Sequence, residues 1–179
     1  MNQKSCTKNQ VEILCFKPKI DKEEAIKIAR KKPFLRREKG QVTETNLMYK
    51  PFMIFKYEAS IRKKKIKDAI IENITFYIAI DMITGLGFEF EKFDEDRVDR
   101  IFVENNQIIK ESISINKAME EASRIAFKFK LKLSKFGFEV LREEVKPIGM
   151  IYKPLWIIKF INKGRESIVG VDAIKGTRV

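Results

Sequence analysis

The sequence predicts an α+β protein of two repeats, each a helix packed on an antiparallel β-sheet. Two segments with helical spacing of apolar residues are each followed by segments rich in aromatic and β-branched residues. Residues 48–57 align with residues 151–160, and residues 80–85 align with residues 171–176, in the same order along the chain. The chain has 179 residues, of which 44% are hydrophobic and 35% charged, with only 8 Gly and 5 Pro. This composition is typical of a globular protein.

The elements of the first half follow from local signals. A strand is expected near residues 11–16. A helix is expected to begin after Asp21, because Glu24 lies three residues further on and completes a capping box. Strand-like residues then cover 42–57, and a second strand ends at Asp81. We assign residues 1–90 to the first repeat, which has a long basic hairpin.

The second half repeats this order. A strand is expected within residues 101–112, a helix begins near Ser114 or Asn116, and strand-like residues cover 138–160. Asn162-Lys163-Gly164-Arg165 predicts a tight turn, followed by a strand that ends at Asp172. We assign residues 101–179 to the second repeat and residues 91–100 to an acidic linker.

Proline and aspartate mark equivalent points in the two halves. Pro51 and Pro154 lack an N–H, so each strand must lie at an edge, begin or bulge there. Asp81 and Asp172 each stand four residues before a glycine, which predicts a carboxylate that accepts turn N–H groups. A catalytic or metal-binding role for the two aspartates is the alternative.

The residue types exclude most catalytic chemistry. The chain has no histidine, which removes Ser-His-Asp and Cys-His catalysis and histidine-ligated zinc. Gly85-Leu86-Gly87 lacks the third glycine and the context of a dinucleotide site. We therefore predict a non-enzymatic protein with no catalytic residues, no metal and no cofactor. Cys6 and Cys15 are expected to be reduced, structural thiols.

Neither a targeting signal nor a membrane span is predicted. Residues 1–10 are polar, and no apolar stretch of signal-peptide length follows them. The longest apolar runs fall far short of the ~20 residues that a spanning helix needs. We expect a cytoplasmic protein.

The charge is strongly basic, with 37 Lys+Arg against 25 Asp+Glu, a net charge of +12. The basic residues cluster in Lys27–Lys39, Arg62–Lys67 and Arg124–Lys135. Most of them are lysine, whereas phosphate recognition favours the bidentate guanidinium of arginine. Nucleic-acid binding is therefore the less favoured alternative. Its candidate residues lie at the tip of the long hairpin, where solvated charge is the default: Arg62, Lys63, Lys64, Lys65 and Lys67.

Two strands carry an apolar pair between lysines on the face that should be solvent-exposed. We call these the lysine-flanked faces: Lys50, Phe52, Ile54 and Lys56 in the first half, and Lys153, Leu155, Ile157 and Lys159 in the second. Either the two halves bury these faces against each other or in a homodimer, or the faces bind an extended protein or peptide by strand addition at the proline-weakened edge. Tyr152 and Trp156 are candidate anchors for such a partner.

One helix followed by two antiparallel strands, the second ending in Val171-Asp172-Ala173-Ile174-Lys175-Gly176, resembles the PepSY domain. Tyr152-Lys153-Pro154-Leu155-Trp156 is similar to that family's strand entry, and Ile80–Gly85 matches more loosely. The resemblance implies small cystatin-like α+β modules, often in tandem and without catalysis, that bind or restrain peptidases.

Overall fold

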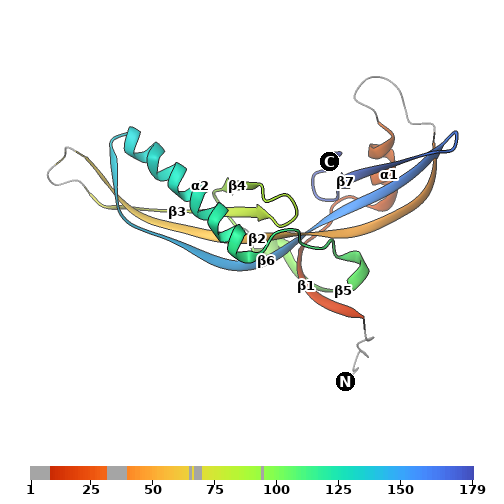
Figure 1. The fold of residues 1–179 in the computed structure, drawn as a ribbon, viewed down its shortest axis with the longest axis horizontal. Coiled ribbons are helices and arrows are strands. Elements are labelled where there is room, and N and C mark those ends of the chain that lie inside the picture. The colour runs from red at the N-terminus through yellow and green to blue at the C-terminus, as the bar shows by residue number, and fades with distance from the viewer. Residues whose placement is uncertain (1–8, 32–39, 65, 67–69, 94) are drawn as a thin grey trace. The chain divides into compact units, whose positions relative to one another are not determined.

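The structure is a computed structural model that describes residues 9–31, 40–64, 66, 70–93 and 95–179. Within these residues the chain forms two α-helices, two short 3-10 turns and seven strands (Figure 1). The helices are α1 (Lys22–Arg30) and α2 (Ile115–Lys135). The strands are β1 (Gln10–Phe16), β2 (Gln41–Lys63), β3 (Glu72–Asp81), β4 (Gly87–Phe90), β5 (Val98–Glu104), β6 (Phe138–Asn162) and β7 (Arg165–Asp172). The 3-10 turns cover Glu95–Arg97 and Asn105–Gln107.

The chain divides into two compact units, and each unit draws on both halves of the sequence. Unit 1 comprises Met1–Lys50, Asp96–Lys110 and Tyr152–Val179, and unit 2 comprises Pro51–Glu95 and Glu111–Ile151. The long strands β2 and β6 contribute residues to both units.

The predicted fold class is wrong in its arrangement, because the chain does not form two repeats that each pack a helix on their own sheet. Backbone pairing joins the seven strands in the order β4-β3-β2-β6-β1-β5, and β7 also pairs with β6. In unit 1, α1 from the first half packs on β6 and β7 from the second half. In unit 2, α2 from the second half packs on β2 and β3 from the first half. Each helix therefore covers the hairpin of the other half.

Hydrogen bonds from the residues that precede each helix also reach the hairpin of the other half. The N–H groups of Lys19 and Ile20 donate to the carbonyl oxygen of Ala173, and those of Ser112 and Ile113 donate to that of Met82. Periodicity fixes which face of each helix is apolar, but the two hairpins offer similar apolar faces. The sequence pattern therefore could not distinguish a helix packed on its own hairpin from one packed on the other.

The core of unit 2 is built by small residues on α2 and large residues on the strands. Ala118, Ala122 and Ala126 recur every four residues and are almost completely buried, so the helix approaches the sheet closely. Phe55 and Tyr57 of β2 are fully buried beneath them. Ser114 is one of the two start points expected from the sequence. It caps the helix by accepting the N–H of Lys117 at 3.3 Å.

Unit 1 follows the same design on a smaller scale. Asp21 caps α1 and accepts the N–H of Glu24 at 2.8 Å, as expected. Ala25 and Ala29 are fully buried against Ile158 and Phe160 of β6. A second cluster forms where β1 pairs antiparallel with β5, around Ile13, Cys15, Tyr49 and Val103. The tight turn after β6 is also confirmed, with left-handed Lys163 and Gly164 between the paired residues Asn162 and Arg165.

The aspartate turns match the structural expectation. Oδ1 of Asp81 accepts the N–H groups of Ile83 and Thr84, and Oδ1 of Asp172 accepts those of Ile174 and Lys175. Gly85 and Gly176 have φ of 74° and 65°, where a side chain would be strained. The two carboxylates thus stabilise equivalent turns at the ends of β3 and β7.

The prolines mark where the ladder with the hairpin partner begins. Phe52 pairs with Asp81 and Leu155 pairs with Asp172, each immediately after its proline. At each proline the hairpin partner still bonds the carbonyl oxygen, because the N–H of Met82 donates to that of Pro51 at 3.1 Å and the N–H of Ala173 donates to that of Pro154 at 3.2 Å. Both prolines are buried, and β2 and β6 have neighbours on both sides, so the expectation of strand addition at a proline-weakened edge is wrong.

Candidate binding surface

The first lysine-flanked face, on β2, is largely closed. Phe52 is 9% exposed and Ile54 is 2% exposed. Lys56 forms an ion pair with Glu58, with 2.7 Å between Nζ and Oε1. Lys50 is half-buried. The two apolar side chains therefore belong to the protein interior.

Strand β4 explains part of this burial. Phe88 pairs with Ala79, which in turn pairs with Ile54, so the three side chains form one row on the face opposite α2. The ring of Phe88 lies 6.1 Å from that of Phe52. In the next row Phe90 stacks on Tyr77 with 5.6 Å between ring centroids. An aromatic edge strand thus covers this face of unit 2.

The second lysine-flanked face, on β6 in unit 1, is more open. Leu155 and Ile157 are only half-buried. Ile168 of β7 pairs with Lys159 and is 64% exposed on the same face, and Val179 is 70% exposed beside Gly170. We call Leu155, Ile157, Ile168 and Val179 the open apolar face.

The lysines of this face are already paired within unit 1. Nζ of Lys153 lies 2.5 Å from Oδ2 of Asp172, whose side chain is 2% exposed. Burial raises the pKa of Asp172, but the bonds from Lys153 and the turn N–H groups stabilise its carboxylate more strongly, so the pKa lies below its ordinary value. Lys159 forms an ion pair with Glu44 of β2, which lowers the pKa of Glu44. These lysines delimit the apolar face and are not unpaired cations.

Tyr152 and Trp156 lie away from the open apolar face. The indole N–H of Trp156 donates to the carbonyl oxygen of Ile20 at 2.9 Å, and its ring packs with the α1 cluster. Tyr152 packs with the cluster around Cys15 and Tyr49. Both aromatic side chains therefore help to build unit 1.

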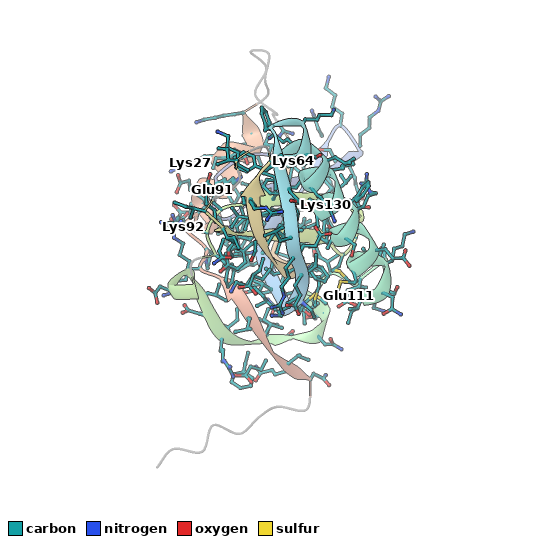
Figure 2. The ribbon with its side chains drawn as sticks, turned by 90° about the vertical axis from the view of Figure 1, so that its left-hand side faces the viewer. Lys27, Lys64, Glu91, Lys92, Glu111 and Lys130 are labelled. Carbon is teal, nitrogen blue, oxygen red and sulfur yellow. The ribbon has the colours of Figure 1, made fainter. Side chains whose placement is uncertain are left out.

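The basic hairpin residues lie against α2 and β6 in unit 2. Arg62 donates to Glu139 at 2.7 Å, and Nζ of Lys64 lies 2.9 Å from Oγ of Ser134 (Lys64 is labelled in Figure 2). Lys63 is exposed. Lys65 and Lys67 lie outside the described residues.

Metal ligation and a reactive Cys15 thiolate are both disfavoured among the described residues. These described residues contain no group of His, Cys, Asp and Glu side chains that could hold a metal ion. Burial raises the pKa of the Cys15 thiol to about 12, which suppresses the reactive thiolate. Over the same described part of the chain, no helix is long and apolar enough to cross a membrane.

Sequence reasoning missed Ile168 and Val179, which complete the open apolar face. Alternation along one strand identified Leu155 and Ile157, but the partner residues depend on the β6–β7 register. The tight turn at Asn162–Arg165 was the one signal that could have fixed this register, by placing Ile168 opposite Lys159. Comparison with protein-family models, with curated proteins and with solved structures finds no match.

Proposed function

We propose that this chain is a non-enzymatic binding protein that takes up an extended segment of another protein along the outer edge of β7, at residues 165–169. The open apolar face supplies the side-chain contacts. The observation that carries the proposal is the exposure of Ile168 and Val179 on the open apolar face, whereas β4 covers the equivalent face of unit 2.

The two hairpins correspond row by row. The row Ile54, Ala79 and Phe88 in unit 2 has its counterpart in Ile157, Gly170 and Val179 in unit 1, where the N–H of Val179 donates to the carbonyl oxygen of Gly170. In the next row, Phe90 covers Tyr77. The counterpart of Tyr77 is Ile168. On the outer side of β7, Arg178 pairs with Val171 and Val179 bonds Gly170, and no described residue pairs with Ile168.

Strand β4 therefore indicates what would fit beside β7. Its residues Gly87–Phe90 place phenylalanines at alternate positions, so both point to the same face of the sheet. An extended partner with apolar side chains at alternate positions would pair with the backbone of β7 and cover Ile168. Main-chain hydrogen bonds would supply affinity, and the alternating side chains would supply specificity.

The test is binding of a fluorescently labelled synthetic peptide with the sequence of residues 85–92, followed by fluorescence anisotropy. We expect saturable binding to the wild-type chain, and at least ~10-fold weaker binding to Ile168→Asp because a charged carboxylate would replace an apolar contact and would have to be desolvated. Ile168 is well exposed, so the variant should fold normally. Ile148→Asp changes an exposed isoleucine of β6 in unit 2, away from β7, and serves as the matched control.

Three results would overturn the proposal. The first is the absence of binding by the wild-type chain. The second is equal binding of a peptide in which both phenylalanines are replaced by serine. The third is a loss of binding in Ile148→Asp as large as that in Ile168→Asp. The peptidase-directed role implied by the PepSY resemblance is a narrower version of this proposal, and it predicts that the captured segment belongs to a peptidase.

A further inference from the structure

A basic and apolar surface forms on unit 2 where the end of β2 meets the C-terminal half of α2. Two basic clusters that lie far apart in the sequence come together here. The N–H of Lys64 donates to the carbonyl oxygen of Gly137 at 2.7 Å, and its side chain contacts Ser134. The end of the basic hairpin is thereby fixed beside the last turn of the helix.

The outward face of α2 carries large apolar residues where solvent exposure predicts polar ones. Phe127 is 57% exposed and Leu131 is 48% exposed, one helical turn apart. Phe136, which ends the helix, is 68% exposed. The buried face of α2 is already occupied by alanines and by Phe129 and Leu133, so these three side chains are not needed by the core.

Positive charge surrounds these apolar side chains. Residues 122–138 contain five basic side chains and no acidic one: Arg124, Lys128, Lys130, Lys132 and Lys135. Lys130 pairs with Glu143 and Arg124 with Glu121 (Lys130 is labelled in Figure 2). Lys63, Lys132 and Lys135 are exposed and form no ion pair with another described residue.

We propose that this surface binds the face of an anionic lipid bilayer. Lysines at its margin would contact the negatively charged headgroups, while Phe127, Leu131 and Phe136 would enter the boundary between headgroups and acyl chains. Two weak contributions, apolar burial and charge attraction, are together what a peripheral protein needs for stable attachment.

The same observations disfavour two other occupants. A second copy of this surface would bring lysines against lysines, which opposes self-association. Nucleic-acid recognition favours arginine forks, whereas the one arginine among residues 122–138, Arg124, is already held by Glu121 and the other basic residues there are lysines.

The experiment is co-sedimentation of the full chain with vesicles. Vesicles of phosphatidylcholine alone are compared with vesicles that contain about one third phosphatidylglycerol. We expect binding to the anionic vesicles only, with a decline as salt rises. Phe127→Gln with Leu131→Gln should reduce binding at least ~10-fold. Lys132→Gln with Lys135→Gln should reduce it roughly 25-fold, since each charge near the surface contributes about fivefold.

Matched controls lie at the other end of α2. Ile115→Gln removes an exposed apolar residue and Lys117→Gln removes an exposed charge, both outside the proposed surface. Neither should alter binding. Circular dichroism verifies that each variant keeps its helix.

The proposal is overturned by equal binding to both vesicle types, by no binding to either, or by controls that reduce binding as much as the test variants. Binding of a DNA duplex or single strand that competes with the anionic vesicles at the same salt would assign the surface to nucleic acid instead. Concentration-dependent dimerisation that disappears in Phe127→Gln with Leu131→Gln would assign it to a second copy.

Discussion

The carboxylate of Asp172 is predicted to be a principal source of stability in unit 1. Its Oδ1 accepts two turn N–H groups, at 2.9 and 3.1 Å, and its Oδ2 lies 2.5 Å from the Lys153 ammonium. Asp172→Asn keeps an oxygen for the turn but loses the charge, so it should cost about 2 kcal/mol, the range for a hydrogen bond to a charged group. Asp172→Ala removes all three partners and should cost about 3–5 kcal/mol.

Urea unfolding followed by fluorescence measures both losses, because Trp156 is the single tryptophan of the chain and lies on β6 beside Val171. Glu44→Gln removes the partner of Lys159 at an exposed site in the same unit and should leave the unfolding midpoint almost unchanged. If Asp172→Asn proves no more destabilising than Glu44→Gln, the assigned role of the buried pair is wrong.

The same carboxylate predicts a pH dependence. The folded-state pKa of Asp172 is lowered, so its contribution should be complete above the unfolded-state pKa of about 4 and should be lost as the pH falls through the folded-state pKa. The difference in unfolding free energy between wild type and Asp172→Asn should therefore stay constant from neutral pH down to about pH 5. It should then shrink in more acid solution. A difference that grows on acidification would contradict this sign.

Three further predictions concern packing, backbone and reactivity. Ala122→Leu should destabilise unit 2 by about 1–3 kcal/mol, because this alanine is fully buried against the sheet; thermal unfolding that leaves the midpoint unchanged would show that α2 does not pack closely there. Gly176→Ala should lower the free energy of unfolding by about 1 kcal/mol or more, because its φ of 65° strains any side chain and Ile20 lies close to an added Cβ. This loss should be larger than that of Gly164→Ala, where an added Cβ meets nothing within 4 Å. Denaturant titration of the two variants measures the order. In a Cys6→Ser background, Cys15 should resist a thiol reagent until denaturant is added, and stoichiometric labelling of the native chain would refute its burial.

Much of the local structure could be predicted from residue types. The caps at Asp21 and Ser114, the aspartate turns before Gly85 and Gly176, and the tight turn at Asn162–Arg165 all depend on contacts within a few residues. Short-range hydrogen bonds leave few alternatives, so these features agree between sequence and structure.

The candidate site was only half visible in the sequence. Alternation placed Leu155 and Ile157 on one face, but the same pattern at Phe52 and Ile54 describes buried residues. The difference lies in strand β4, whose Phe88 covers the first face. On the second face, the equivalent position beside Gly170 holds the smaller side chain of Val179. Exposure depends on what a third strand contributes, and periodicity along one strand cannot report it.

The absence of histidine was determined by the sequence alone, and it is the observation from which we predicted binding in place of catalysis. The sequence also determined which faces of the helices and strands are apolar. Only the tertiary structure decided that each helix covers the hairpin of the other half, and that Lys64 lies beside the basic end of α2. The physical reason is that hydrophobic burial is non-directional: it rewards any partner with a matching apolar face, and the two halves offer nearly interchangeable ones.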